Sequence, residues 1–374
     1  MKKRRFLIMT ASIGSGHIKA AEAVEAELRK QYPQDEVLTI DFMSEETSWF
    51  NGFLKRLYLR MLAFVPNLYD VCYKVSGAGS SGVMAQNMFA VTMYRTMKRI
   101  LKKYQPDILV CTHPFPEGAA ALCKRMGMDG FRIAAVLTDY SLHQIWIYPQ
   151  VDFYFTATEE MRDGLVSMGF SKERVISSGI AVDSNAARVP GRSEARKRLG
   201  VLEDEKVVLL MGGGLGLGGI KETLEELERV KMPLRILTVA GHNEELKQQA
   251  EEQKKRSRHE IDIWGYTNEI GLLMAVSDVL VTKPGALTMS EAFVMGLPML
   301  LREPIPGPET ENAVYASCHG AAVWVHHGES LAYAAEQVLS DPSQLAAMRE
   351  AALSCARPQA AEVIARHLGN MPAQ

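Results

Sequence analysis

Long hydrophobic runs are missing from this chain of 374 residues. No stretch approaches the ~18 consecutive apolar residues that span a membrane. The basic start "MKKRR" is followed by an apolar run of only about five residues, which ends in a glycine loop unlike a secretory signal. The sequence therefore predicts no membrane-spanning helix, and any contact with a membrane is expected to be peripheral.

Cysteine is also scarce, and none of it occurs in a C-x-x-C pair. The cysteines are five in number: Cys72, Cys111, Cys123, Cys318 and Cys355. An odd number without metal-ligand spacing excludes a regular disulfide framework and gives no zinc signature. A Walker lysine motif and low-complexity segments are absent as well. A reducing cytoplasm is the expected compartment.

Charge is nearly balanced overall but unevenly distributed. The net charge is -2, yet residues 1–110 hold sixteen Lys and Arg against ten Asp and Glu, which is +6 and leaves -8 for residues 111–374. This is either chance unevenness on a solvated surface or a basic half that faces an anionic surface.

Short apolar segments alternate with helical patterns along the whole chain. "RFLIMT", "EVLTIDF", "PDILVCTHP" and "FRIAAVLTDY" are strand-like in the first half, and "KVVLLMGGG", "LRILTVAG" and "DVLVTKPG" in the second. This alternation predicts an α/β protein with two doubly wound parallel sheets. A polar stretch near 183–195 separates the predicted domains, 1–185 and 196–345, and helices at 346–374 are placed to cross back to the first domain.

Three strand-to-helix junctions contain glycine, which lets a backbone approach a ligand closely, and expose the free amides of a helix N-terminus. They are Gly14–His17, Gly212–Gly219 and Gly285–Thr288. The G-x-G-x-x-G match within "MGGGLGLGGI" is weak, since six glycines crowd the run and no acidic residue ends the next strand. These junctions are either phosphate-binding loops or flexible turns.

Glu291, in "KPGALTMSEAF", has two readings. Thr288 and Glu291 have the spacing of a capping box, in which Glu291 returns a hydrogen bond to the start of its own helix. Alternatively, the carboxylate accepts both hydroxyls of a ribose whose diphosphate lies on the first amides of that helix.

An apolar stripe runs through the segment between the second and third predicted strands. Phe50, Phe53 and Leu57 recur on it at helical spacing, whereas Lys55, Arg56 and Arg60 stand largely off it. Such a helix either packs on its own domain or lies in the headgroup region of an anionic membrane.

Several motifs together resemble a known family. "KPGALTMSEAFVMGLP" followed by "PIPGPETEN" is similar to the nucleotide-sugar signature of glycosyltransferase family 28, which contains the peptidoglycan N-acetylglucosaminyltransferase and the monogalactosyldiacylglycerol synthases. "GSGHIKAAEA", "THPFP" and "LTDYSLHQIW" resemble the branch that uses diacylglycerol, including its processive glucosyltransferases. The motifs follow the family's order from residue 11 to about residue 315.

The resemblance implies the GT-B fold, in which two Rossmann-like domains face each other across a cleft. The first would bind the acceptor and the membrane, the second would bind the UDP-sugar, and no metal or other cofactor would be obligatory. The implied donor contacts are Gly16, Gly213, Gly214, Gly285, Ala286, Leu287 and Thr288 for the diphosphate, Ile263 to Tyr266 for the uracil, Glu291 for the ribose, and Glu309 and Asn312 for the hexose.

His17 stands in the first turn of a predicted helix, where the dipole lowers the imidazole pKa and favours a neutral ring. In an inverting transfer such a ring accepts the proton of the attacking hydroxyl. The alternatives are a capping or packing histidine, or one that only positions the substrate. Asp139 orients His17, acts as the base itself or occupies a plain turn, and His113 and His143 either contact the acceptor or are structural.

The resulting hypothesis is an inverting transfer of glucose or galactose from UDP-hexose to 1,2-diacylglycerol, by a cytoplasmic protein peripheral on the inner face of the membrane. One or more sugars would be added to the lipid. The alternatives are a cell-wall lipid N-acetylglucosaminyltransferase and a non-catalytic nucleotide-sugar sensor that binds a partner protein. No nucleic-acid partner is expected.

Overall fold

The computed structural model describes residues 3–12, 15–44, 79–183, 189–212, 219–305 and 307–371. The chain divides into two compact units. Unit 1 comprises Met1–Asp183, Pro306–Pro308 and Gln359–Gln374, and unit 2 comprises Ser184–Ile305 and Glu309–Pro358. Within the described ranges, no helix combines the length and apolar character needed to cross a bilayer.

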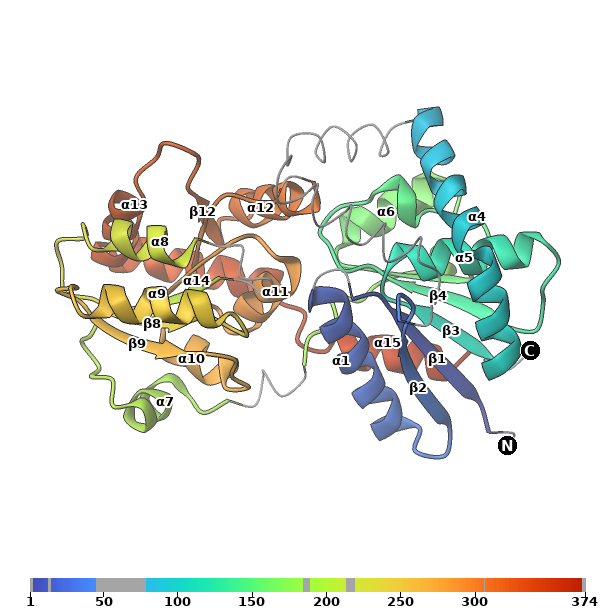
Figure 1. The fold of residues 1–374 in the computed structure, drawn as a ribbon, viewed down its shortest axis with the longest axis horizontal. Helices are drawn as coiled ribbons and strands as arrows, with labels where there is room; N and C mark the ends of the chain where they lie inside the picture. The colour runs from blue at the N-terminus through green and yellow to red at the C-terminus, as the bar shows by residue number, and fades with distance from the viewer. Residues whose placement is uncertain are drawn as a thin grey trace. The chain divides into compact units, whose positions relative to one another are not determined.

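Unit 1 contains a parallel six-stranded sheet in the order β2-β1-β3-β4-β5-β6 (Figure 1). Its strands are β1 (Arg5–Thr10), β2 (Glu36–Asp41), β3 (Ile108–Cys111), β4 (Arg132–Val136), β5 (Phe153–Thr156) and β6 (Val175–Ser177). Its α-helices are α1 (Ser15–Gln31), α4 (Gly79–Tyr104), α5 (Pro114–Arg125), α6 (Glu159–Ser167) and α15 (Ala360–Gly369), with 3-10 turns η1 (Gln144–Trp146) and η2 (Lys172–Arg174). The central strands are continuous apolar runs because helices bury both faces of a parallel sheet.

The last helix, α15, belongs to unit 1 although unit 2 precedes it in the chain. It packs beside α1 (Figure 1) and buries Ile364, Ala365 and Leu368. Arg4, just before β1, donates to the carbonyl oxygen of Gly369 and pairs with Asp35 at 2.6 Å. The C-terminal segment therefore completes the hydrophobic core of the first sheet.

Unit 2 contains a second parallel six-stranded sheet, in the order β12-β11-β10-β7-β8-β9. Its strands are β7 (Val207–Met211), β8 (Arg235–Val239), β9 (Glu260–Trp264), β10 (Val279–Thr282), β11 (Met299–Leu301) and β12 (Ala322–Trp324). Its helices are α7 (Arg192–Leu199), α8 (Ile220–Leu227), α9 (Glu244–Lys254), α10 (Ile270–Val276), α11 (Ala286–Val294), α12 (Pro308–Cys318), α13 (Leu331–Ser340) and α14 (Pro342–Cys355).

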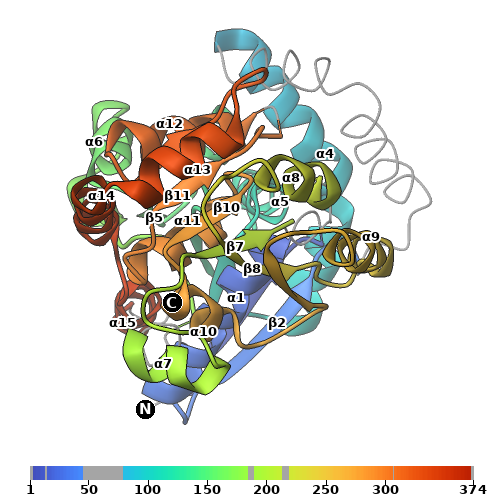
Figure 2. The ribbon, with the colours of Figure 1, turned by 90° about the vertical axis from the view of Figure 1, so that its left-hand side faces the viewer.

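An apolar core lies between the second sheet and the helices α8, α9 and α13. Val208 and Leu210 of β7 contribute to it from the sheet, and Leu224 of α8 and Val338 of α13 from the helices. Figure 2 shows α8 and α9 side by side over β7 and β8, as their contacts require. The predicted α/β architecture with two parallel sheets is confirmed.

Each sheet reverses its strand order at one point, and such a point is where open α/β sheets bind ligands. In unit 1 it lies between β1 and β3, and in unit 2 between β7 and β10. The chain segments that leave the carboxyl ends of these four strands include all three glycine-containing junctions. The topology thus directs attention to these junctions in both units.

Two groups of predicted site residues lie outside the described residues. They are the proposed membrane helix with Phe50, Phe53, Lys55, Arg56, Leu57 and Arg60, and the loop glycines Gly213 and Gly214. Their roles stay predictions from the sequence.

Candidate active site

His17 connects three segments at the switch point of unit 1. It lies in the first turn of α1, and its Nδ1 is 2.8 Å from the carbonyl oxygen of Thr112 and 2.8 Å from Oγ1 of Thr138. Thr112 Oγ1 donates in return to the carbonyl oxygen of His17 at 2.9 Å. The carboxyl ends of β3 and β4 therefore fix the orientation of the imidazole.

These contacts select one tautomer of His17. A backbone carbonyl only accepts hydrogen bonds, so Nδ1 must carry the ring proton to bond Thr112, and the Thr138 hydroxyl then accepts from the same N–H. With the proton on Nδ1, Nε2 of the neutral ring keeps a lone pair. The ring is thereby prepared to accept a proton at Nε2.

Burial keeps the His17 ring neutral at physiological pH. The pKa of His17 is lowered from its ordinary value of 6.5 chiefly by desolvation, while Asp139 and the bond to Thr112 oppose the shift. The helix dipole proposed from the sequence gives the same direction, but burial is the main cause. Asp139 itself directly follows Thr138 beyond β4, and its negative charge favours the protonated form of the imidazole.

His113 and His143 share a structural role. His113 Nδ1 accepts from the amide of Phe115 at 3.1 Å and caps α5, and His143 Nδ1 accepts from the amide of Ile145 at 3.2 Å and caps η1. In both rings Nε2 must then carry the proton. The ring of His113 also lies against His17, with centroids 4.5 Å apart, and burial together with His17 lowers its pKa well below the usual range.

In unit 2, helix α11 begins at the switch point with Gly285 as its N-cap, and this glycine has no side chain that could accept from the first helical amides. Because the helix starts at Ala286, Thr288 is already its third residue. The capping-box reading of Thr288 and Glu291, which requires Thr288 as the cap, is therefore wrong. Glu291 lies one turn further along, half-buried.

Packing does not explain the glycines at the two junctions that are described. A Cβ at Gly16 or at Gly285 would meet no described atom within 4 Å, and Gly285 has an ordinary φ of -71°. Neither conformation nor crowding within the described residues demands glycine at these positions. The open space at both positions would allow a ligand to approach the backbone closely.

Lys283 and Glu309 form an ion pair beside this helix start, and both side chains are largely buried. Glu309 also accepts from the amide of Ile305 at 2.8 Å. Asn312, fully buried in α12, donates through Nδ2 to the carbonyl oxygen of Pro284 at 3.2 Å. These predicted sugar-binding residues thus fix the turn Lys283–Gly285 that leads into α11.

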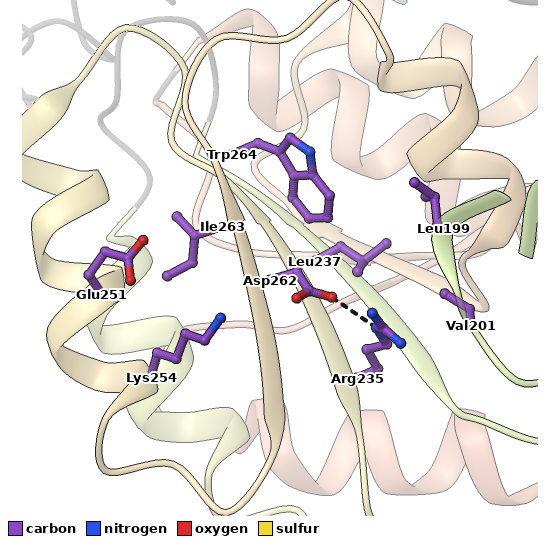
Figure 3. Close-up of a pocket in the computed structure, with 9 residues that line it drawn as sticks. All are labelled: Leu199, Val201, Arg235, Leu237, Glu251, Lys254, Asp262, Ile263 and Trp264. Atoms are coloured by element: carbon purple, nitrogen blue, oxygen red, sulfur yellow. Dashed lines mark hydrogen bonds and ion pairs between the residues drawn. The ribbon is translucent and has the colours of Figure 1, made fainter.

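The segment predicted to hold the uracil ends in an exposed aromatic pair. Tyr266, just beyond β9, is 52% exposed and stacks on His242, with ring centroids 4.2 Å apart and planes at 14°. Figure 3 shows a neighbouring pocket of about 390 Å³ that Ile263 and Trp264 line. The Arg235–Asp262 ion pair lies in this pocket, and Arg235 begins β8 at the end opposite the switch-point loops.

Three residues of this arrangement are missing from the sequence prediction: Thr112, Thr138 and Lys283. Each directly precedes or follows a predicted site residue or motif, in "CTHP", "LTDY" and "TKPG". Their position at strand ends is a usable signal, but their partners lie far away in the sequence. Among the described residues, no group of three or more His, Cys, Asp or Glu side chains is arranged to hold a metal ion.

Comparisons with known proteins identify the family of this chain. The monogalactosyldiacylglycerol synthase family model matches residues 17–182, and the glycosyltransferase family 28 C-terminal domain matches residues 207–365. A processive diacylglycerol β-glucosyltransferase of Bacillus mycoides is 31% identical over 368 residues, which cover 96% of this chain and 92% of that protein. A processive diacylglycerol β-glucosyltransferase of Bacillus cereus is 30% identical over 365 residues, which cover 96% of this chain and 92% of that protein.

Solved structures share the fold at low sequence identity. MurG of Acinetobacter baumannii superimposes with a TM-score of 0.63 at 15% identity, covering 99% of this chain and 100% of that chain. HepE of Anabaena, solved with UDP-glucose, gives 0.58 at 14% identity, with coverage of 98% and 100%. This chain is therefore a GT-B glycosyltransferase, and it belongs to the family that contains the monogalactosyldiacylglycerol synthases and the processive diacylglycerol β-glucosyltransferases.

Proposed function

We propose that this enzyme transfers glucose from UDP-glucose to the free hydroxyl of 1,2-diacylglycerol with inversion at the anomeric carbon. The observation that carries the mechanism is the placement of His17 Nδ1 between Thr112 and Thr138, which leaves Nε2 as a base. The sugar and the acceptor are those in the names of the relatives at 30–31% identity. Their β-linked product implies inversion, because the glucose of UDP-glucose is α-linked.

The chemical step follows from this base. Nε2 of His17 takes the proton of the acceptor hydroxyl while the oxygen forms a bond to the anomeric carbon. The bond between that carbon and the phosphate oxygen breaks, and UDP leaves with the electron pair. A base with this role contributes about 10²- to 10⁴-fold to the rate, and Asp139 stabilises the imidazolium that results.

Unit 2 supplies the donor site in this proposal. The amides of Ala286, Leu287 and Thr288, at the uncapped start of α11, receive the diphosphate, whose charge increases as UDP departs. Glu291 accepts the ribose hydroxyls, and the stacked pair Tyr266–His242 offers a flat surface to the uracil. Gly213 and Gly214 would complete the phosphate contacts from the loop after β7.

Contact with the acceptor lipid is proposed to occur through residues 50–60. Their sequence pattern supports this, with Phe50, Phe53 and Leu57 on an apolar stripe and Lys55, Arg56 and Arg60 largely off it. The enzyme would then work as a peripheral protein on the cytoplasmic face of the membrane. Its rate is expected to rise with anionic lipid and to lose that advantage at high salt.

A donor and acceptor panel tests the proposal. The purified chain is incubated with UDP-glucose, UDP-galactose or UDP-N-acetylglucosamine, each with diacylglycerol vesicles or with a polyprenyl-diphosphate cell-wall intermediate, and the lipids are separated. We expect glucosyl transfer to diacylglycerol, with addition of further sugars at longer times if the enzyme is processive. N-acetylglucosamine transfer to the cell-wall lipid, or binding of UDP without any turnover, would contradict the proposal.

A further inference from the structure

Three arginines of unit 2 converge on one buried carboxylate. Arg192 reaches Asp278 at 2.7 Å, and Arg196 and Arg349 each reach it at 3.1 Å. Asp278 also accepts from the amide of Val207 at 2.9 Å. The proposed catalytic step uses none of these groups.

The three guanidinium groups are not equivalent. Arg196 is 1% exposed and donates to the carbonyl oxygens of Val276, Leu202, Glu203 and Glu205 besides Asp278, so it is a structural residue. The side chains of Arg192 and Arg349 are 34% and 36% exposed. Within the described residues Arg349 donates only through Nη2, to Asp278, so its Nε and Nη1 have no acceptor there. Hydrogen-bond donors thus remain available at the surface of the cluster.

The cluster carries more positive charge than the protein neutralises. Three guanidinium groups and one carboxylate have a net charge of +2. The macrodipoles of α10 and α11 place about half a negative charge at the carboxyl end of each helix. Burial, together with the charges of Arg196 and Arg349, lowers the pKa of Arg192 against the opposing effect of Asp278. About one positive charge therefore remains for an external anion.

A pocket of about 500 Å³ opens directly on this cluster. Arg192 and Arg349 line it on one side, and Met274, Val294, Leu297 and Leu353 provide apolar walls. Leu353 is 56% exposed, although its side chain is fully apolar. A cavity of this size with a charged side and an apolar side suits a ligand that has both characters.

We propose that this pocket binds the phosphate group of an amphiphilic phosphoester. The guanidinium groups of Arg192 and Arg349 would hold the phosphate, since their planar donor array matches its oxygens. The apolar walls would cover the hydrophobic part of the same molecule. A free phosphate ion has the same anionic group but no apolar part, so the affinities of the pocket for free phosphate and for an amphiphilic phosphoester must be compared by experiment.

The position of the pocket separates it from the proposed donor site. Val294 lies at the carboxyl end of α11, whereas the proposed diphosphate site lies at the amino end, about 13 Å away for nine helical residues. Val189 and Pro358 also line the pocket. Pro358 is the last residue of unit 2 before the chain returns to unit 1 at Gln359, so the pocket reaches this connection on the side of unit 2.

Calorimetric titration of the full chain tests the proposal with three probes: inorganic phosphate, dihexanoyl phosphatidic acid below its micelle concentration, and dihexanoyl phosphatidylcholine. We expect the phosphatidic acid to bind at least about tenfold more tightly than inorganic phosphate, because only it fills the apolar walls. The zwitterionic lipid should bind more weakly than the phosphatidic acid.

Arg349→Gln is the informative variant, because Arg192 and Arg196 still neutralise Asp278. We expect about tenfold weaker binding of phosphatidic acid. Arg198→Gln, on the exposed face of α7 and paired with Glu269 at 3.1 Å, is the matched control and should bind like the wild type. UDP affinity, measured on the same proteins, should be unchanged, which keeps this test independent of the proposed transfer reaction.

The inference is overturned by any of three results: no binding of phosphatidic acid, equal binding by the wild type and Arg349→Gln, or equal affinity for phosphatidic acid and phosphatidylcholine. Equal affinity for phosphatidic acid and inorganic phosphate would refute the amphiphilic ligand.

Discussion

Thr138 acts on the proposed chemistry only through His17. Its buried hydroxyl lies 2.8 Å from Nδ1, so it helps to hold the orientation of the ring whose tautomer the Thr112 carbonyl selects. Thr138→Val keeps the shape of the side chain and removes the hydroxyl. We expect kcat/KM for transfer to fall about tenfold through the loss of this hydrogen bond, with KM for UDP-glucose unchanged.

The control is Thr138→Ser, which should restore most of the activity. In the wild type, the acid limb of the pH profile should lie below pH 6.5, because burial lowers the pKa of His17 from that value and the base is lost only when Nε2 is protonated. Two results would count against a positioning role. One is a loss of free energy of unfolding in Thr138→Val that is large enough to explain its lost activity, and the other is a Thr138→Ser variant that does not recover activity.

The sequence was sufficient to select His17, Asp139 and Glu291 as candidates, since each follows a strand end and belongs to a recognisable motif. It was not sufficient to find their partners. The contacts of His17 reach across 95 residues to Thr112 and 121 residues to Thr138. Threonine after a strand is too common to be selected without the topology that brings β1, β3 and β4 together.

At the level of single elements, the proposed donor site assigns Gly285, the N-cap of α11, a role in binding the diphosphate. Gly285 has a φ of -71°, and a Cβ there would meet no described atom within 4 Å. Gly285→Ala should therefore leave the melting temperature almost unchanged while UDP binds at least about tenfold more weakly, because the methyl group occupies the space of the diphosphate. Calorimetry with UDP and thermal unfolding measure the two effects, and unchanged UDP affinity would contradict the assigned phosphate site.

Helix α5 carries a buried acid in its first turn. Glu117 is 0% exposed, and burial raises its pKa well above the usual 4.5 against the opposing effect of the Tyr154 hydroxyl. Above pH 4.5 the unfolded chain releases this proton while the folded chain keeps it, so the folded state loses stability as pH rises toward the raised pKa.

Glu117→Gln removes this titration at nearly the same volume. Relative to the wild type, its free energy of unfolding should increase by up to ~1.4 kcal/mol per pH unit above 4.5, until the raised pKa is reached. Urea unfolding at about pH 5 and about pH 8 measures the difference. Glu173→Gln, at an exposed position of η2, is the matched control and should show no such trend; a pH-independent difference for Glu117→Gln would refute a neutral buried acid.

Elements were easier to predict than their ends. Strands such as β3 and β10 are fully buried apolar runs bounded by polar residues, so periodicity alone located them. The start of α11 was harder, because "KPGALTMSE" offers both Gly285 and Thr288 as caps. The structure selects Gly285, because its carbonyl oxygen already accepts the first helical hydrogen bond, from the amide of Met289 at 3.0 Å.

For the molecule as a whole, the C-terminal helix should stabilise the unit in which the chain begins. Ile364 of α15 is 0% exposed in the core that α15 shares with α1. Ile364→Ala should lower the free energy of unfolding by about 2–5 kcal/mol through the cavity that it creates. Val91→Ala, at a position 61% exposed on α4, is the control with a small expected effect.

If the two units unfold in separate transitions, the loss of stability in Ile364→Ala can be assigned to one of them. UDP should raise the transition of unit 2, because a ligand that binds the folded state stabilises it. The loss in Ile364→Ala should then appear in the other transition. A loss confined to the transition that UDP raises would contradict the assignment of α15 to unit 1.

The proposed mechanism divides the work between the units: unit 1 provides the base, and unit 2 binds the donor. The most direct test is the turnover of UDP-glucose with diacylglycerol by His17→Gln, together with its affinity for UDP. We predict that transfer falls by about 10²- to 10⁴-fold while UDP binds as tightly as to the wild type. Transfer within about threefold of the wild type would contradict the assignment of His17 as the base.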